Sequence, residues 1–115
     1  MGNSKVGKAR IADLPGTENS DRFEGHTTGS SVSVFLSHHK PGTGPGLHTH
    51  PYEETFFVFE GDVLFTVDGE EIEAGDGDIV VVPANTPHKF LSRGERLRQF
   101  SVHPVPRMEQ ENLED

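Results

Sequence analysis

Three histidines and one glutamate are spaced so that a single metal ion could use all four side chains. His48 and His50 lie two positions apart, Glu54 follows shortly after them, and His88 comes after a later turn. Imidazole nitrogens and a carboxylate oxygen form a mixed ligand set that suits divalent Fe, Mn, Co, Ni or Zn. A five- or six-coordinate ion would keep open positions beside these ligands. The sequence therefore predicts a metal site inside a small β-barrel, with room for a substrate.

Strand geometry explains how these side chains could converge. Side chains alternate along a strand, so His48 and His50 project from the same face. Glu54 has the same parity and follows Pro51, whose fixed φ favours a bend that returns the carboxylate towards the two imidazoles. His88 begins a strand after a turn bracketed by prolines, where the chain comes back to the same end of a barrel.

The elements that must position these residues read as short strands separated by tight turns. The chain has 115 residues, with 13 glycines, 8 prolines and a hydrophobic fraction of 31%, and no long stretch has helical periodicity. The Asp68-Gly69 pair predicts a hairpin. Strands are expected near residues 32–36, 55–59, 63–67, 78–82, 88–91 and 95–103. This pattern predicts an all-β domain, a sandwich or a barrel.

The alternation of apolar residues also predicts which side chains fill the interior. The first strand has one apolar face, made of Val32, Val34 and Leu36, and the run at 78–82 reads as a buried strand. Most phenylalanines are expected in the core, and some must also wall the metal cavity. The ones considered are Phe35, Phe56, Phe57, Phe59, Phe65, Phe90 and Phe100.

Composition divides the chain into three parts. Residues 1–30 are polar and rich in Gly, Ser and Thr, which is typical of an arm that docks by a few contacts or frays. Residues 31–103 contain the expected strands and form the barrel domain. Residues 104–115 are an acidic tail without a core pattern.

Charge and composition exclude several classes of function. With 19 acidic and 10 basic residues the formal charge is −9, so most of the surface would repel a polyanion and nucleic acid is not an expected partner. The chain has no cysteine, which removes thiolate ligands and nucleophiles. No apolar run follows the basic start of the chain, so neither a signal peptide nor a membrane span is expected, and the cytoplasm is the expected location.

Two stretches around the candidate ligands resemble the two conserved motifs of the cupin superfamily. Asn85 stands where the family usually has glycine, and Ser92 where it often has asparagine. Neither departure removes a ligand, and asparagine is the non-glycine residue best able to adopt a positive φ, so the turn can be kept. The matching residues are Gly42, His48, His50, Glu54 and Gly61 in the first motif, and Gly77, Pro83 and His88 in the second.

The resemblance covers about residues 31–103 and implies a double-stranded β-helix, a jelly-roll barrel, with the metal inside it. It also implies a small-molecule substrate or ligand and a homodimer, since family members are frequently dimers. The superfamily includes dioxygenases, decarboxylases, isomerases, epimerases and non-catalytic binding or storage proteins, so the fold does not fix the reaction.

Several other polar residues are candidates for the site or its rim. Glu53 neighbours a candidate ligand but has the opposite parity, so it is expected to face outwards. Of His38 and His39, one should point inwards and the other outwards. His103 is either a surface histidine or a proton carrier at the barrel mouth, if its strand passes the metal. The last strand offers three side chains that could fix an anionic substrate: Arg96, Arg98 and Gln99.

The leading hypothesis is a metal-dependent enzyme of dioxygenase or isomerase type that acts on a small organic substrate. One alternative is a non-catalytic module in which the metal fixes the fold or holds a small ligand. Another is a metal-independent sugar isomerase or epimerase that uses the histidines as acid and base groups. The sequence assigns no catalytic residue beyond the four candidate ligands.

Overall fold

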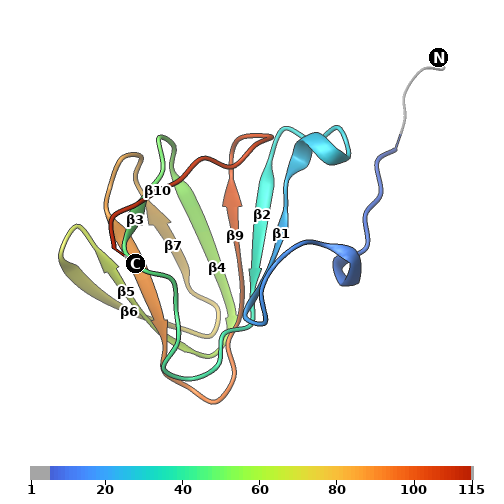
Figure 1. Cartoon of the computed structure of the whole chain (residues 1–115). Helices are drawn as coiled ribbons and strands as arrows, with labels where there is room; N and C mark the ends of the chain where they lie inside the picture. The colour runs from blue at the N-terminus through green and yellow to red at the C-terminus, as the bar shows by residue number, and fades with distance from the viewer. Residues whose placement is uncertain (1–5, 115) are drawn as a thin grey trace.

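The structure, a computed structural model, describes residues 6–114 and consists of two β-sheets that face each other (Figure 1). Two single-turn 3-10 helices, η1 (Ile11–Asp13) and η2 (Gly25–Thr27), accompany the strands. The strands are β1 Ser20–Phe23, β2 Ser33–Ser37, β3 His48–Thr49, β4 Glu54–Glu60, β5 Asp62–Val67, β6 Glu70–Gly75, β7 Ile79–Val82, β8 His88–Ser92, β9 Arg98–His103 and β10 Glu111–Asn112. None of the helices in this part of the chain has the length and hydrophobicity needed to cross a membrane.

The two sheets are antiparallel and have the strand orders β1-β2-β9-β4-β7 and β10-β3-β8-β5-β6. Neighbours such as β2 and β9 are far apart in the sequence, because the chain crosses repeatedly from one sheet to the other. Such crossing connections are typical of a jelly roll. The predicted all-β jelly-roll barrel is confirmed.

The β5–β6 hairpin supplies fully buried apolar side chains to the interior. Val63 and Phe65 on β5 are fully buried, and Phe65 is the strand partner of Phe90 on β8. Phe56, which comes from β4 in the facing sheet, packs edge-on against Phe65 with ring centroids 4.9 Å apart. Asp68 and Gly69 both have positive φ, 50° and 79°, as a tight hairpin turn requires.

Three phenylalanines expected in the core lie instead on the outer face of the β1-β2-β9-β4-β7 sheet. Phe57 on β4 stacks on Phe100 on β9 with ring centroids 4.9 Å apart, and Phe59 is 63% exposed. The core prediction is therefore wrong for these three. The reason is parity, because Phe56 and Val58 occupy the inward face of β4 and the residues between them must point outwards.

β7 is also not the fully buried strand that its apolar run predicts. Ile79 and Val81 are 61% and 54% exposed, whereas Val82 is buried. β7 lies at the edge of its sheet and pairs only with β4. Only its inward face is covered, so alternate apolar residues face outwards.

The inward face of β2 carries two serines and Phe35, although the alternation predicts Val34 and Leu36 as the apolar face of this strand. Ser33 and Ser37 are buried, Phe35 lines a cavity, and the alternating positions between them face outwards. The same holds for the neighbouring strand β9, whose inward side chains are Gln99, Ser101 and His103. The part of the barrel interior that β2 and β9 line is therefore mainly polar, and we call it the polar half.

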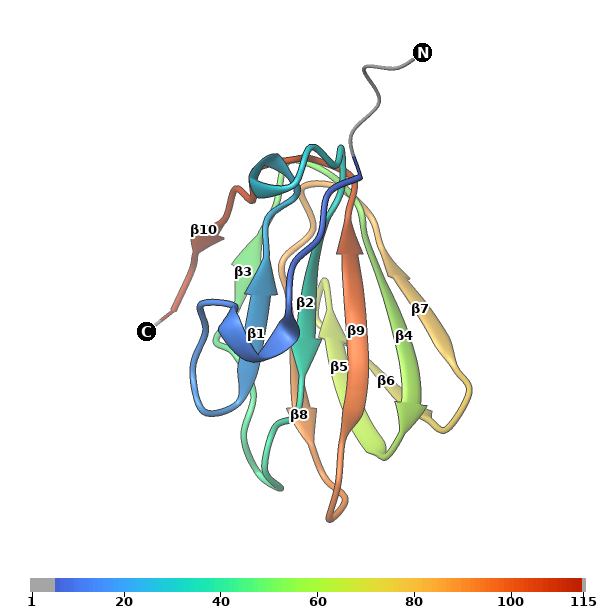
Figure 2. The ribbon, with the colours of Figure 1, turned by 90° about the vertical axis from the view of Figure 1, so that its right-hand side faces the viewer.

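The expected arm and the expected tail, which flank the predicted barrel domain, each add a strand to one sheet. β1, within the expected arm, pairs with β2 over its whole length, and Figure 2 shows the two strands side by side. β10, within the expected tail, pairs with β3, where Asn112 faces His48. The Leu113 N–H also donates to the Leu47 carbonyl at 2.8 Å. The arm and the tail are thus joined to the sheets by regular backbone pairing.

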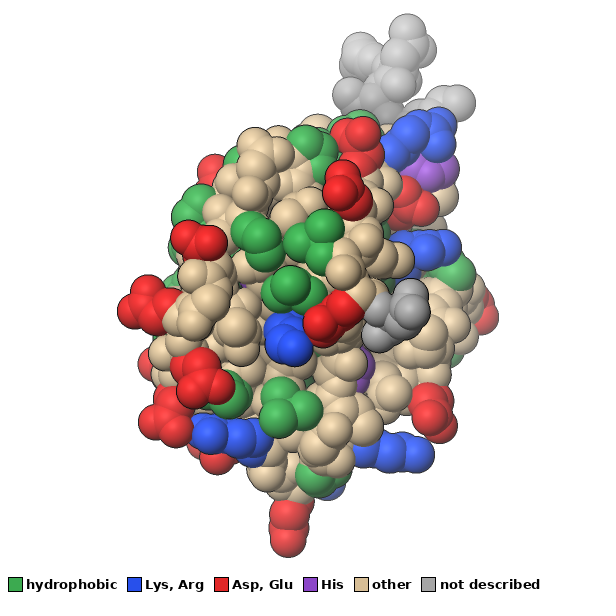
Figure 3. All heavy atoms as spheres, turned by 60° about the vertical axis from the view of Figure 1, so that its left-hand side comes forward, with side chains coloured by type: hydrophobic (Ala, Val, Ile, Leu, Met, Phe, Trp, Pro, Cys, Tyr) green, Lys and Arg blue, Asp and Glu red, His purple; other side chains and the backbone are tan. Residues whose placement is uncertain are grey.

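The surface of the described chain mixes acidic and basic side chains. Acidic groups are spread over the face drawn in Figure 3, with basic groups between them and a few apolar side chains near the centre. Some of the charges form ion pairs at the surface, such as Lys89 with Glu114 and Arg93 with Glu73. Exposed pairs of this kind contribute little to stability.

Candidate metal centre

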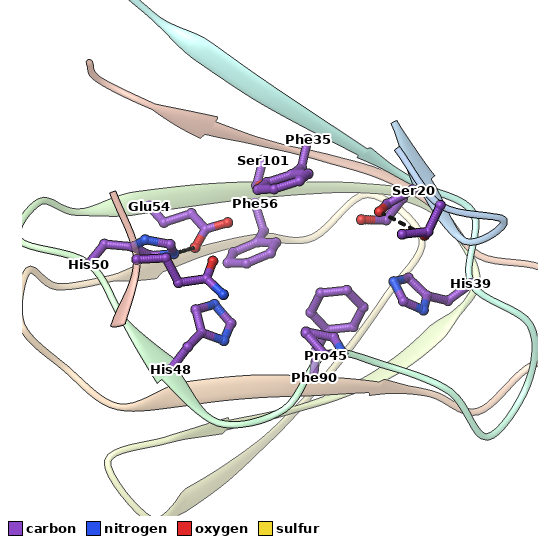
Figure 4. Close-up of a pocket in the computed structure, with 13 residues that line it drawn as sticks. Ser20, Phe35, His39, Pro45, His48, His50, Glu54, Phe56, Phe90 and Ser101 are labelled. Atoms are coloured by element: carbon purple, nitrogen blue, oxygen red, sulfur yellow. Dashed lines mark hydrogen bonds and ion pairs between the residues drawn. The ribbon is translucent and has the colours of Figure 1, made fainter. Parts of the chain in front are cut away.

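The structure brings together the four predicted ligands from two sheets. His48 on β3 and His88 on β8 are strand partners, whereas Glu54 begins β4 in the facing sheet and His50 lies on the connection between the sheets. We call these four residues the His/Glu cluster. One potential ligand atom from each lies within 4.8 Å of all the others. All four side chains are buried, and Figure 4 shows three of them gathered at one end of a cavity.

Backbone carbonyls fix the orientation of the three imidazole rings in the cluster. Nδ1 of His48 lies 2.8 Å from the Gly46 carbonyl oxygen, and Nδ1 of His88 lies 2.8 Å from that of Thr86. Nδ1 of His50 lies 2.6 Å from the carbonyl oxygen of Glu109. A carbonyl can only accept, so each Nδ1 carries a proton and each neutral ring presents the lone pair of Nε2.

The remaining nitrogens face the Glu54 carboxylate, and this arrangement fits a divalent cation. Glu54 Oε1 lies 3.1 Å from His50 Nε2 and 3.0 Å from His88 Nε2. His50 Nε2 is buried and has no well-aligned hydrogen-bond partner. Unprotonated nitrogens would repel the carboxylate unless a proton or a metal ion lay between them. Ligand atoms about 3 Å apart also match two perpendicular bonds of about 2.1 Å to one ion.

The protonation equilibria of the cluster reflect its burial and its crowding. Burial raises the pKa of Glu54, but its contacts with His103, His50 and His88 outweigh this effect and hold the pKa well below its usual value. Burial and the neighbouring His88 and His50 rings lower the pKa of His48 to about 4, against the raising effect of the Gly46 carbonyl. Burial lowers the pKa of His50, but the opposing effects of Glu54 and the Glu109 carbonyl are together larger, so the pKa is raised overall.

His103 lies inside the site and contacts the second oxygen of Glu54. It is fully buried at the end of β9, and its Nε2 lies 3.1 Å from Glu54 Oε2, although the angle is poor for a hydrogen bond. Its Nδ1 lies 2.8 Å from the Tyr52 hydroxyl. The surface-histidine reading is therefore wrong, and the strand does run past the cluster.

Tyr52 links His103 to the chain segment that follows β9. Its hydroxyl accepts from the Glu109 N–H at 3.2 Å and is within donating distance of the Glu109 carbonyl oxygen, also at 3.2 Å. Burial, together with nearby carboxylates and against the effect of this carbonyl, raises the pKa of Tyr52 to about 12. The phenol therefore stays protonated, and both the Glu109 carbonyl and His103 Nδ1 lie within reach of its single proton. The contact with His103 Nδ1 is the shorter, at 2.8 Å against 3.2 Å, which favours donation to His103 and places the proton of a neutral His103 ring on Nε2, facing Glu54. In this tautomer His103 turns an N–H towards the carboxylate, in contrast to the three cluster histidines, which turn Nε2 lone pairs towards it.

Sequence reasoning missed Tyr52 and Glu109. The Glu109 backbone contacts both His50 and Tyr52, yet no sequence pattern identifies a residue that acts through its peptide group. Tyr52 could have been noticed as the only tyrosine of the chain, placed between two candidate ligands. Its ring stacks on His50 at a centroid distance of 5.1 Å.

The turn before His88 keeps its geometry despite the asparagine at the position where glycine is usual. Asn85 has φ of 59°, the left-handed conformation expected for it. Its N–H donates to the His50 carbonyl at 2.7 Å. The turn therefore ties the second motif to the first directly beside the cluster.

A cavity of about 290 Å³ opens from the cluster into the barrel. Its walls come from both sheets and include Phe35, Phe56 and Phe90, so some phenylalanines do wall the cavity as expected (Figure 4). His39 lines the end away from Glu54, whereas His38 points outwards and lies 3.3 Å from Asp21. The predicted opposite orientations of these two histidines are confirmed.

The charged candidates outside the cluster lie away from the cavity. Glu53 is exposed, as its parity predicts. Arg96 and Arg98 are also exposed and do not line the cavity, so the suggestion that they fix an anionic substrate there is wrong. Arg98 alternates with the inward residues of β9, and Arg96 precedes the strand at the opposite end from His103. Gln99 is buried but is not among the cavity-lining residues.

Comparison with protein families gives a match to the Cupin domain over residues 35–103. Among curated proteins, the chain is 46% identical over 44 residues to quercetin 2,3-dioxygenase from Bacillus subtilis, covering 37% of this chain and 13% of that protein. It is 42% identical over 48 residues to acireductone dioxygenase from Leptospira biflexa, covering 38% of this chain and 27% of that protein. The chain therefore corresponds to a small part of these relatives.

Solved structures show the same fold at low sequence identity. Oxalate decarboxylase from Bacillus subtilis superposes with a TM-score of 0.84 at 17% identity, over 98% of this chain and 33% of that one. Salicylate 1,2-dioxygenase from Pseudoaminobacter salicylatoxidans gives a TM-score of 0.71 at 21% identity, over 84% and 29% of the two chains. These similarities concern the barrel.

Proposed function

Because this chain belongs to the cupin family, we propose that it is a metal-dependent enzyme that acts on a small organic substrate by dioxygenase or isomerase chemistry. In this proposal the four residues of the His/Glu cluster hold one divalent ion. The likeness to quercetin 2,3-dioxygenase and acireductone dioxygenase favours the dioxygenase type. The short coverage of those proteins leaves the reaction itself as a proposal.

One observation carries the metal assignment. Three buried rings each donate Nδ1–H to a backbone carbonyl, so three Nε2 lone pairs and a carboxylate converge in one place. Metal-binding histidines are commonly oriented by such second hydrogen bonds, which also fix the tautomer. Buried acceptors that face one another are costly unless a proton or a cation lies between them, and a divalent ion would compensate all four at once.

The chemistry would divide between the ion and the chain. A divalent ion in the cluster supplies Lewis-acid or oxygen-activating chemistry at its open positions. His103 holds a proton on Nε2 against Glu54 Oε2 and so orients the carboxylate, with Tyr52 fixing the tautomer of His103. The apolar walls at Phe56 and Phe90 exclude water from the space beside the cluster.

Metal analysis combined with oxygen uptake tests the proposal. Protein purified without a metal-affinity column should contain close to one divalent ion per chain, or should take up one on anaerobic reconstitution with iron. The iron-loaded protein should consume dioxygen with a member of a panel of phenols, keto-enols and carbon acids, or isomerise one without dioxygen. A folded protein that binds no divalent ion would refute the metal assignment.

The binding module remains the alternative outcome of that experiment. A protein that holds the metal but turns over no member of the panel would favour a module that binds metal or a small ligand. Metal-free protein that epimerises a sugar nucleotide would favour the third hypothesis. The clustering of lone pairs around Glu54 argues for the metal in preference to that outcome.

We also propose that the protein is a homodimer in the cytoplasm. The support for the dimer is the apolar outer face of the β1-β2-β9-β4-β7 sheet, where Phe59, Ile79 and Val81 are more than half exposed. Contiguous exposed apolar groups of this kind often mark a protein interface. Light scattering should give twice the chain mass for the wild type and the chain mass for Phe59→Lys. A monomeric wild type at micromolar concentration would contradict the dimer, and imaging of the tagged chain tests the location.

A further inference from the structure

The cavity continues past the His/Glu cluster to a second polar end. His48, His50 and Glu54 line one end, whereas Ser20 and His39 line the other, and Figure 4 shows phenyl rings between the two groups. The volume of about 290 Å³ lies at the small end of the range for organic ligands. A ligand that fills the cavity is therefore small and has two polar ends.

The cavity lining lacks positive side chains. No lysine or arginine is found among the lining residues of the described chain, and Glu54 is the one carboxylate there. Arg96 and Arg98 point away from it into solvent. A charge that enters a low-dielectric cavity without a partner pays a large desolvation cost. The cavity therefore disfavours a ligand with a charged group beyond the one that approaches the metal.

The middle of the cavity is built for a flat apolar group. Phe35 comes from β2, and Phe56 and Phe90 come from β4 and β8, so rings from both sheets enclose this space. Phe56 and Phe90 pack edge-on against each other with centroids 5.9 Å apart, which holds both rings in place. Fixed aromatic walls favour an aromatic ring by stacked or edge contacts.

His39 gives the far end a hydrogen-bond acceptor. The Thr43 hydroxyl donates to the Lys40 carbonyl at 2.7 Å, so it can only accept from His39 Nδ1, which lies 3.2 Å away. The neutral ring then has its lone pair on Nε2, for which the described chain supplies no hydrogen-bond partner. Burial and the nearby His38 lower the pKa of His39, which favours this neutral form. Such an acceptor selects a ligand that donates a hydroxyl proton.

We propose that the cavity binds a hydroxylated aromatic compound of one or two rings, with an oxygen donor towards the His/Glu cluster and a second hydroxyl towards His39. The compound carries no carboxylate or phosphate. The placement of the first oxygen rests on the proposed metal function. The aromatic middle and the acceptor at the far end are independent of it.

Matched ligand pairs test this proposal by calorimetry on metal-free and on zinc-loaded protein, kept anaerobic to prevent turnover. One pair is catechol and hydroxyquinol, and the other is phenylcatechol and its para-hydroxyphenyl analogue, with oxalate as the charged comparison. In at least one of the two pairs, the ligand with the extra hydroxyl should bind about five- to tenfold more tightly than its partner, as one added hydrogen bond predicts. Oxalate should bind zinc-loaded protein more weakly than the preferred phenol and should not bind metal-free protein.

The His39→Leu variant tests the far end, with His38→Leu as its matched control. His39→Leu should lose the advantage of the extra hydroxyl and keep the affinity for the ligand without it. His38→Leu should behave as the wild type, because His38 points outwards. The wild-type ligand series decides the proposal by itself should His39→Leu fail to fold.

The outcomes separate this proposal from the metal function. Tighter binding of oxalate than of every phenol by zinc-loaded protein would overturn the ligand class and leave the metal site standing. Equal affinities within both matched pairs would overturn the role of His39. A protein that binds no zinc but still prefers the hydroxylated members supports the aromatic cavity and refutes only the metal function.

Discussion

Two groups of strands, one from each sheet, contribute opposite chemistry to the barrel interior. β5, β6 and β8 bury Val63, Phe65, Ala74 and Phe90 in a packed core. β2 and β9 direct serines, Gln99 and His103 inwards together with Phe35, and place their other apolar residues outside. Buried polar groups contribute less to stability than apolar ones of similar size, so a barrel selected for stability alone would not be built this way. One half holds the fold together, and the other shapes the cavity beside the His/Glu cluster.

The largest expected effect comes from a cavity made in the packed half. Phe65→Ala removes a fully buried ring that packs against Phe56 and Phe90. The free energy of unfolding should fall by about 3–5 kcal/mol. Urea denaturation measures the loss. Ser101→Ala, a buried change on the polar half, should cost less than about 1 kcal/mol. Similar costs for the two variants would contradict the division between the halves.

Loss of a metal ligand should weaken metal binding and leave the fold intact, in contrast to Phe65→Ala. His50→Ala removes one of the four proposed ligands and should weaken metal binding by more than about a hundredfold, since even outer partners of metal ligands are worth about 10–100-fold. The metal-free variant should keep the wild-type circular dichroism spectrum. Chelator competition measures the affinity. Unchanged metal affinity in the folded variant would refute the ligand assignment.

The pH dependence of the metal-free protein should report on His48. Its folded pKa of about 4 lies below the ordinary value of 6.5, so the unfolded chain binds a proton first as the pH falls. The stability due to neutral His48 is complete above pH 6.5 and is lost progressively towards pH 4. Between pH 6.5 and 4.5 the loss should reach about 2 kcal/mol.

Urea denaturation at several pH values, with His48→Gln for comparison, isolates this contribution. The raised pKa of His50 changes the stability with pH only above about pH 6.5, and the lowered pKa of Glu54 changes it only below about pH 4.5. Neither therefore obscures the effect of His48 between about pH 6.5 and 4.5. His48→Gln should have a flatter dependence than the wild type by about one proton. Parallel curves for the two proteins would contradict the burial of a neutral His48.

The smallest effect is expected from a single hydroxyl. Tyr52→Phe keeps the ring stacked on His50 but removes the donor to His103, so the proton facing Glu54 is no longer fixed. Metal affinity should fall about tenfold, and the nitrogen NMR signals of His103 should show a mixture of tautomers. Ser101→Ala, which removes another buried hydroxyl from the same half, should change neither property. Wild-type tautomers in Tyr52→Phe would rule out this role.

Local chemistry explains why the sequence was informative about the cluster and the turns. The parity of His48 and His50, the glycine and asparagine positions with positive φ and the Asp68-Gly69 hairpin all depend on near neighbours. Predictions for Phe57, Phe59 and Val81 were wrong because alternation shows that a strand has two faces but not which face the barrel encloses.

Residue types and short-range spacing were enough to predict an all-β chain, its tight turns and a set of four residues suited to a metal, because these features depend on near neighbours. The presence of His103 and Tyr52 in the site depends on the three-dimensional fold, since pairing of β9 with β4 brings His103 to Glu54 and Tyr52 contacts His103. The fold also decided that Arg96 and Arg98 stay outside the cavity while His39 lines it. Those outcomes depend on sheet register and on which face is enclosed, and both are set by contacts between residues far apart in the chain.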